Sequence, residues 1–270
     1  MKDITDKEFW QIRDYVKVNL GISLSDEKKS LIYSRLRSTL QELGFENFTQ
    51  YYEYLVGDKT KQALVRFIDK VTTNHTFFMR EVEHFEYYRD TALPAIEETW
   101  GTGKDLRLWC AACSSGEEPY TLAMINQDYF KGKGWNTQLL ATDISNEILD
   151  KAVYGVYSNE SLSALPEKWK KDYLTRFDAD HSSISNEIKS QVIYRKFNLM
   201  ETNFRFKKKF HVIFCRNVMI YFDSDTRDQV VSKFYDMTEP GGFLFIGHSE
   251  TLSHSNTQYK YIMPATYKKI

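Results

Sequence analysis

The stretch Leu106-Arg107-Leu108-Trp109-Cys110-Ala111-Ala112-Cys113-Ser114-Ser115-Gly116-Glu117-Glu118-Pro119-Tyr120 decides the fold of this chain. Its apolar first half, residues 106–112, predicts a buried strand, and the small residues 113–116 predict a tight turn. Two glutamates and a proline then open a helix. A strand, a turn of small residues and a helix start together form the place where α/β folds bind nucleotide-like ligands.

Strands and helices alternate along the chain from about residue 85 onward. The apolar runs predict strands at 106–112, 138–142, 192–197, 210–215 and 243–247. The remaining segments predict helices at 83–97, 117–130, 146–153 and 225–237. This alternation predicts a mostly parallel, doubly wound, Rossmann-like α/β sheet. Residues 259–262 and 266–270 predict a terminal hairpin that adds an antiparallel edge.

The N-terminal third of the chain has helical periodicity instead. Thr5 is expected to cap a first helix that Gly21 ends, and Ser25 to cap a second helix that ends at Gly44. Two shorter helices follow at 48–56 and 61–71.

We therefore divide the chain into a helical domain, residues 1–84, and an α/β domain, residues 85–270. Within the second domain, residues 158–190 interrupt the strand-helix rhythm with Pro166 and many Ser, Asn and charged residues. We expect an inserted subdomain there, made of a helix and small antiparallel strands.

Composition bounds the function. The 270 residues are 42% hydrophobic and carry a formal net charge of -1, which does not favour nucleic acid as a partner. No apolar stretch is long enough to span a bilayer, and the polar start lacks the core of a signal peptide, so we expect a cytoplasmic protein without membrane insertion.

Three cysteines fit reduced thiols, and Cys110 and Cys113 form a C-x-x-C pair. Because no second pair accompanies them, we expect no metal site. A redox motif at a strand-to-helix turn stays an alternative to small residues packed in that turn.

Two acids at the start of the helix after Gly116 constrain the ligand. The turn is neither G-x-G-x-x-G nor a P-loop, and Glu117 and Glu118 would repel a phosphate. They suit a cationic or zwitterionic ligand, and S-adenosylmethionine carries both a sulfonium and an ammonium group. The alternative is that the acids only complement the helix dipole.

Polar residues at the predicted strand ends add to this candidate site. Asp143 ends the second strand, where an acid accepts hydrogen bonds from ribose hydroxyls, unless it caps the next helix. Asn198 follows the third strand, and Arg216 and Asn217 follow the fourth. Two further segments place polar groups in apolar, aromatic surroundings: Asn74, Thr76 and Arg80 in one, and Tyr221 in the other.

The second predicted helix is locally basic. Lys28 and Arg35 lie on one border of its apolar stripe and Arg37 on the other, and Lys29 adds to the charge. Solvated flanking charge is the ordinary explanation. The more specific explanation is a docking surface for an acidic helical partner.

The motifs together resemble the CheR family, the chemotaxis receptor glutamate methyltransferases. The matching segments, in order and spacing, are Asn74-His75-Thr76-Phe77-Phe78-Met79-Arg80, Cys113 to Tyr120, Asp143, Cys215-Arg216-Asn217-Val218-Met219-Ile220-Tyr221-Phe222 and Gly247-His248-Ser249-Glu250. The resemblance covers nearly the whole chain. His75 and His211 depart from the residues expected there.

The resemblance implies methyl transfer from S-adenosylmethionine, leaving S-adenosylhomocysteine, to glutamates on the cytoplasmic helices of chemoreceptors. It implies that the cofactor site is lined by Asn74, Thr76, Arg80, Glu117, Asp143, Asn198, Leu199, Arg216 and Asn217. Arg80 and Tyr221 would face the substrate glutamate. The alternative is a non-catalytic domain of the same fold that binds the cofactor or its product and signals.

The receptor is expected to dock on Lys28, Lys29, Arg35 and Arg37. Some family members also bind a receptor's C-terminal tail on the inserted sheet, through a glycine-rich loop. Residues 177–187 contain no glycine here, so we expect no high-affinity tail site. We expect the protein to be a monomer.

Overall fold

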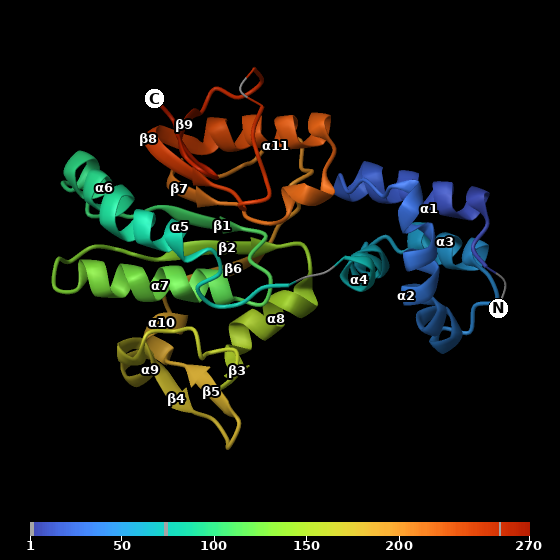
Figure 1. The fold of residues 1–270 in the computed structure, drawn as a ribbon, viewed down its shortest axis with the longest axis horizontal. Coiled ribbons are helices and arrows are strands. Elements are labelled where there is room, and N and C mark those ends of the chain that lie inside the picture. Colours follow the sequence, from blue (N-terminus) through green and yellow to red (C-terminus); the bar gives the residue numbers. More distant parts are fainter. Residues whose placement is uncertain (1–2, 73–74, 254) are drawn as a thin grey trace. The chain divides into compact units, whose positions relative to one another are not determined.

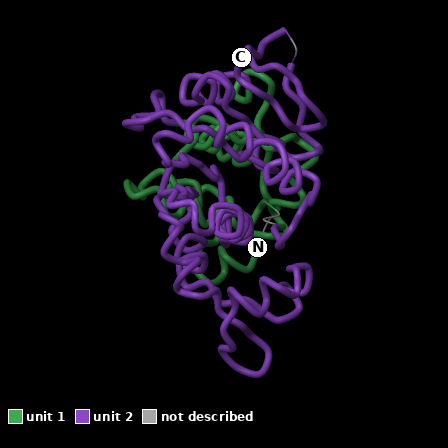
Figure 2. Tube along the Cα trace, turned by 90° about the vertical axis from the view of Figure 1, so that its left-hand side faces the viewer, with its two compact units in different colours: residues 1–75, 198–200, 221–227 green, residues 76–197, 201–220, 228–270 purple. Residues whose placement is uncertain are grey.

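The computed structural model describes residues 3–72, 75–253 and 255–270. The chain divides into two compact units, which Figure 2 colours separately. Unit 1 comprises residues 1–75, 198–200 and 221–227, and unit 2 comprises residues 76–197, 201–220 and 228–270.

Unit 1 is helical, as its periodicity predicts. Its elements, blue to cyan in Figure 1, are α1 (Asp6–Leu20), the short 3-10 helix η1 (Asp26–Lys28), α2 (Lys29–Glu42), α3 (Phe48–Gly57) and α4 (Gln62–Val71). The expected cap of α1 is confirmed, because the Thr5 hydroxyl accepts the Glu8 N–H while the Glu8 carboxylate accepts the Thr5 N–H. Gly21 ends α1 with a φ of 69°.

The expected side-chain cap at Ser25 is wrong. The chain enters η1 there, and the N–H of Lys28 is satisfied by the backbone carbonyl of Ser25 at 2.9 Å. The hydroxyl is therefore not needed at this turn.

Helices pair within unit 1, α1 against α3 and α2 against α4. Buried apolar side chains such as Ile12, Leu36 and Leu64 fill the space between them. The segment 221–227 belongs to the same unit, where Lys17 forms an ion pair with Asp223.

Unit 2 is built on a seven-stranded sheet in the order β6-β2-β1-β7-β8-β10-β9. Its strands are β1 (Leu108–Ala111), β2 (Leu139–Asp143), β6 (Val192–Lys196), β7 (Phe210–Phe214), β8 (Thr238–Phe245), β9 (Lys260–Met263) and β10 (Thr266–Lys268). The first five pair in parallel, and β10 pairs antiparallel with both β8 and β9. The predicted doubly wound sheet and terminal hairpin are both confirmed.

Helices cover both faces of this sheet (Figure 1). They are α5 (Val82–Tyr87), the π-helical turn η2 (Tyr88–Ala92), α6 (Leu93–Trp100), α7 (Glu117–Phe130), α8 (Asn146–Tyr154) and α11 (Ser224–Met237). On β1, Trp109 packs against Phe234 of α11, whereas the next side chain, Cys110, contacts Glu118 of α7. Because successive strand residues face opposite sides, α7 and α11 lie on opposite faces.

Two predicted elements differ in detail. The helix expected at 83–97 is interrupted by η2. The strand expected from Phe243 begins at Thr238, because Thr238 already pairs with Phe210 of β7. A register shift, within which Gly241 has a φ of 84°, separates this pair from the pairs that start at Phe243.

The inserted segment forms a three-stranded antiparallel sheet in the order β3-β5-β4. Its elements are β3 (Val156–Ser158), α9 (Glu167–Tyr173), β4 (Leu174–Arg176), β5 (His181–Ile184) and α10 (Asn186–Lys189). The Asp128 carboxylate on α7 anchors it by accepting hydrogen bonds from Lys168, Trp169 and Tyr173. The expected helix and antiparallel strands are confirmed. None of the described helices is both long and apolar enough to cross a membrane.

Candidate functional site

The carboxyl ends of β1, β2 and β7 meet at the topological switch point of the sheet. From β1 the strand order runs one way to β2 and β6 and the other way to β7 and β8. The segments that leave these ends, 112–116, 143–145 and 215–217, are therefore neighbours. This is the edge where doubly wound sheets bind their ligands.

The turn after β1 is held open by hydrogen bonds from its neighbours. The Ser114 N–H donates to the Asp143 carboxylate at 2.9 Å, and the Tyr157 hydroxyl donates to the Ser115 carbonyl at 2.6 Å. Ala112 and Ser114 have φ values of 60° and 49°, a region that non-glycine residues seldom enter. Such strain persists where the surroundings determine the backbone, and it is concentrated at functional sites.

Asp143 organises this turn as well as ending β2. One carboxylate oxygen accepts the Ser114 N–H and the other accepts the Ser145 N–H at 3.1 Å. The cap of α8 is Ser145 itself, whose hydroxyl accepts the Ile148 N–H. A carboxylate has about four acceptor positions, so these two backbone bonds do not by themselves exhaust Asp143 as an acceptor.

The two glutamates that open α7 have different environments. The Glu118 carboxylate lies 2.5 Å from the Arg216 guanidinium. The residue Glu117 is only 8% exposed, and its carboxylate accepts hydrogen bonds from the Ser115 hydroxyl at 2.8 and 3.0 Å. Among the described residues no Lys, Arg or His nitrogen lies within 4 Å of the Glu117 carboxylate, and burial raises the pKa of this carboxyl. A cationic ligand would compensate this buried negative charge.

Arg216 follows β7 and is held inside the protein. Its guanidinium forms ion pairs with Glu81 at 3.0 Å and Glu118, donates to the Arg80 carbonyl and lies over the Phe85 ring. Burial disfavours its charge, but the two carboxylates raise its pKa. Arg216 therefore links the end of β7 to the start of α7 and to residues 80 and 81.

Asn217 is fixed by two acids that the sequence analysis did not single out. Its side-chain amide donates to Glu81 at 3.1 Å, and its backbone N–H donates to Glu250 at 3.1 Å. Glu250 also accepts the N–H of Gly247 at 2.6 Å. Glu81 and Glu250 stand beside and inside motifs of the sequence analysis. The burial of Glu250 among backbone donors, however, follows only from the folded structure.

The backbone is strained at Glu81 and Asn217, and it is closely packed at Gly247. Glu81 and Asn217 have positive φ values of 56° and 60°. A Cβ at Gly247 would collide with the Asn217 side chain, so only glycine fits there.

Arg80 precedes Glu81 and is the more exposed arginine of the site. Its side chain is 28% exposed, its Nε lies 4.0 Å from Glu81, and its guanidinium lies 5.8 Å from the Phe77 ring centroid. The side chain of Arg216, in contrast, is 2% exposed. Thr76, four residues before Arg80, is half-buried in the same unit.

Three other predicted site residues belong to unit 1. The Asn198 amide donates to the Asn19 carbonyl at 3.0 Å, and Leu199 is buried. Tyr221 ends the 3-10 helix η3 (Met219–Tyr221), and its carbonyl accepts the Ser23 N–H at 2.7 Å. Asn74 lies outside the described residues.

The predicted docking cations are not equivalent. Lys29 pairs with Asp6 at 2.6 Å, and Lys28 lies 5.7 Å from the Tyr221 ring centroid. Arg35 donates to the carbonyls of Val71 and Thr72 at the end of α4. Of these four side chains Arg37 is exposed, whereas the other three are half-buried.

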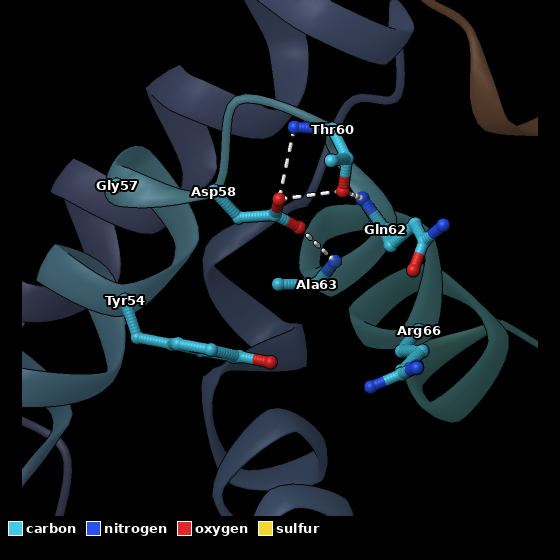
Figure 3. Close-up of a pocket in the computed structure, with 7 residues that line it drawn as sticks. All are labelled: Tyr54, Gly57, Asp58, Thr60, Gln62, Ala63 and Arg66. Carbon is cyan, nitrogen blue, oxygen red and sulfur yellow. Dashed lines mark hydrogen bonds between the residues drawn. The ribbon is translucent and has the colours of Figure 1, made fainter.

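A surface hollow also lies on unit 1. It is lined by Tyr54, Gly57, Asp58, Thr60, Gln62, Ala63 and Arg66, which Figure 3 shows. Its one carboxylate, Asp58, accepts the N–H groups of Thr60 and Ala63 at 2.9 and 2.7 Å. This acid serves the start of α4, so the hollow has no comparable set of converging groups.

Comparison with known proteins agrees with the geometry at the switch point. Residues 74–268 match the family model described as CheR methyltransferase, SAM binding domain, and residues 7–72 match CheR methyltransferase, all-alpha domain. The chain belongs to the CheR methyltransferase family. The domain that contains the switch-point site is therefore the family's S-adenosylmethionine-binding domain.

Relatives of this CheR chain match over nearly their full length. The chemotaxis protein methyltransferase of Borreliella burgdorferi is 43% identical over 271 residues, which cover 99% of this chain and 95% of the relative. The chemotaxis protein methyltransferase of Escherichia coli is 34% identical over 259 residues, covering 95% of this chain and 88% of the relative.

Proposed function

We propose that this methyltransferase forms methyl esters on glutamate side chains of chemoreceptor cytoplasmic helices, as part of chemotaxis adaptation. The names of the full-length relatives support the process, and the family resemblance supports the substrate. The observation that carries the cofactor assignment is the buried Glu117 carboxylate, which has no cationic side chain within 4 Å among the described residues. S-adenosylmethionine brings two positive centres to such a site.

The residues at the switch point fit this cofactor. Glu117 would face a cationic group of the bound molecule, and Asp143 would accept hydrogen bonds from its ribose. Asn74, Thr76, Asn198, Leu199 and Asn217 are proposed as its remaining contacts, with Arg80 at the border with the substrate. Arg216, which is enclosed by Glu81 and Glu118, would act mainly by holding these segments in place.

The proposed methyl transfer requires the protein to position the reacting groups, and it does not require a proton transfer. A glutamate carboxylate is already ionised at neutral pH, so its oxygen can attack without a general base. When bound, S-adenosylmethionine supplies an electrophilic methyl group, and transfer leaves a methyl ester and an uncharged thioether. The protein must align the carboxylate and exclude water.

Arg80 and Tyr221 are the residues we assign to that alignment. A guanidinium can hold a carboxylate by charge-assisted hydrogen bonds, and a phenol can donate a second bond. The Arg80 side chain is 28% exposed, so a substrate can reach it, whereas Arg216 is enclosed. An arginine that bound the substrate carboxylate more tightly would lower the nucleophilicity of its oxygen.

The function is tested with labelled methyl groups. The protein is incubated with S-adenosylmethionine labelled in its methyl group and a purified chemoreceptor cytoplasmic fragment. We expect label on the fragment that alkali releases as volatile methanol, because esters hydrolyse in base and methylamines do not. A fragment whose candidate glutamates are changed to glutamine should accept none. Binding of the cofactor without any transfer would instead support a non-catalytic signalling domain.

The role of Tyr221 is tested by Tyr221→Phe, which removes only the hydroxyl. We expect the affinity for S-adenosylmethionine to stay within a few-fold, while methyl transfer falls about tenfold or more because an orienting bond is lost. Tyr154→Phe, at a surface tyrosine that is 59% exposed, is the matched control. Full activity of Tyr221→Phe would remove the hydroxyl from the mechanism.

A further inference from the structure

A second cluster of ligand-type side chains lies beside the site, within unit 2. Glu81, His84 and His248 each offer one donor atom, and these atoms all lie within 4.8 Å of one another. Glu81 and His84 are three residues apart at the start of α5, and His248 follows β8 in the segment 247–250. The sequence shows no metal-binding spacing here, because the third residue comes from a distant part of the chain.

His84 is the observation that points to a ligand. It is 0% exposed, and neither ring nitrogen meets a hydrogen-bond partner among the described residues. Buried polar atoms without partners are rare and call for an explanation. The Nδ1 atom lies 3.5 Å from a Glu81 carboxylate oxygen.

That separation suits coordination better than a hydrogen bond. Two ligand atoms at about 2.1 Å from a tetrahedral ion lie about 3.4 Å apart. The Pro264 carbonyl lies near the same ring as a weak acceptor, although neither ring nitrogen makes a hydrogen bond of full geometry to a described residue. A metal-bound histidine donates its other ring N–H to such a carbonyl, which fixes the orientation of the ring.

His248 completes the set from the surface. Its ring centroid lies 4.5 Å from that of His84 at an interplanar angle of 81°. Because His248 is exposed, it can turn toward an ion and leave a fourth coordination position open to solvent. The opposing charge is the Arg216 guanidinium, which pairs with Glu81 and is partly offset by Glu118.

We propose that Glu81, His84 and His248 form a binding site for a divalent transition metal of the zinc class. Two imidazoles and one carboxylate are a donor set that Zn²⁺ accepts, and they do not suit Mg²⁺ or Ca²⁺, which prefer oxygen ligands. Three protein ligands with a solvent-facing fourth position make a reversible site.

The same carboxylate links this site to the cofactor site. Glu81 accepts hydrogen bonds from Arg216, Asn217 and the His248 N–H. The Oε2 atom of Glu81 faces His84 and accepts from Arg216 and the His248 backbone N–H, whereas Oε1 accepts from Asn217. An ion on Oε2 draws negative charge from the carboxylate and thereby weakens the bond between Oε1 and Asn217. Metal and cofactor therefore oppose each other, and by linkage each weakens the other by the same factor. This coupling rests on the proposed cofactor role of Asn217, whereas the metal site itself does not.

The metal site is tested by titrating Zn²⁺ alone into the full-length protein in an isothermal calorimeter, and Co²⁺ alone in a visible spectrometer. We expect one ion per chain and the intense visible absorption of a four-coordinate Co²⁺ centre. His248→Gln changes an exposed residue and should weaken binding at least about tenfold. His181→Gln, at a half-buried histidine of the inserted sheet, is the matched control and should bind as the parent does.

Equal Zn²⁺ affinity of His248→Gln and the parent chain, or no stoichiometric binding by the parent chain, would overturn the site. The coupling is read separately, by titrating S-adenosylhomocysteine with and without Zn²⁺. Lower affinity with Zn²⁺ in the parent chain but not in His248→Gln supports it. Unchanged affinity alongside confirmed metal binding overturns the coupling alone.

Discussion

At the scale of single residues, burial decides what each charged group of this chain does. Glu117 and Glu118 are neighbours at the start of α7, yet Glu118 is paired with Arg216, whereas Glu117 accepts from the Ser115 hydroxyl and has no cationic partner among the described residues. The same holds for the two arginines of the site, of which Arg216 is enclosed and Arg80 is partly exposed. The residue type supplies a charge, and the neighbouring side chains determine whether that charge is paired inside the protein.

Glu117→Gln should weaken S-adenosylmethionine binding by roughly 1.5–3 kcal/mol, the scale for hydrogen bonds to a charged group. Burial raises the pKa of Glu117 in the free protein, and a cationic ligand favours its ionised form. Parent-chain affinity should therefore fall as the pH is lowered, and this dependence should be flatter in the variant. Isothermal titration across pH measures both effects. Glu147→Gln, at an exposed acid of α8, is the control, and unchanged affinity of Glu117→Gln would exclude its role.

His211 should make folding pH-dependent. It is 1% exposed, and burial, followed by the Arg107 guanidinium, lowers its pKa from 6.5 to about 4, while Asp105 opposes the shift. Arg107 lies 2.6 Å from its Nε2 and pairs with Glu239 on its other side, and the Trp100 ring packs on the imidazole. The folded state therefore keeps His211 neutral.

Because the unfolded chain binds this proton first, stability is full above pH 6.5 and declines as the pH falls toward 4. The expected loss from His211 is about 3 kcal/mol. Urea unfolding of His211→Gln and the parent chain at several pH values checks this. The variant should lose less stability between pH 6.5 and 4, and equal losses would contradict the assignment.

At the scale of elements, the start of α7 is the most constrained position of the sheet edge. Gly116 has a φ of 102°, and a Cβ there would lie 2.7 Å from the Tyr157 hydroxyl and 3.0 Å from the Ala152 Cβ. The Tyr157 hydroxyl is held by the Ser115 carbonyl, so it cannot easily move away. Tyr157 also packs edge-on against Phe78, so β3 supports two motifs at once.

Gly116→Ala should therefore combine backbone strain with a steric clash. Gly132 lies just beyond the other end of α7, has a φ of 76°, and has nothing within 4 Å of an added Cβ. Gly132→Ala should cost about 1 kcal/mol for strain alone, and Gly116→Ala a further 1–3 kcal/mol, approximately, for overpacking. Denaturant unfolding gives the difference, and only Gly116→Ala should reduce cofactor affinity. Equal stability of the two variants would contradict the clash.

At the scale of the whole molecule, two units supply different parts of the proposed activity. The switch-point loops of unit 2 carry Glu117, Asp143 and Asn217, and unit 1 carries the basic helix α2. Among the four proposed docking residues, Arg37 is exposed, whereas Arg35 is engaged with the carbonyls at the end of α4.

Charge reversal should separate these two arginines. Arg37→Glu should raise the KM for a receptor fragment and leave cofactor affinity unchanged, with the parent KM rising as salt screens the attraction. Arg35→Glu should also destabilise the helical unit, because it loses bonds to the Val71 and Thr72 carbonyls. Arg66→Glu, at an exposed arginine of α4, is the control. A KM that responds neither to salt nor to Arg37→Glu would contradict the docking surface.

The amino-acid sequence alone predicts the doubly wound sheet, the helical first third and the ligand edge from its apolar periodicity, turn residues and caps, because these signals are local. It also marked Glu117, Asp143 and Arg216 by their place after strands. The folded chain alone reveals that Glu117 lacks a cationic neighbour within 4 Å among the described residues while Arg216 is enclosed, and that Glu81 lies beside His84 and His248. Glu118 and Arg216 are 98 positions apart and Glu81 and His248 are 167 positions apart, and no local pattern encodes such contacts.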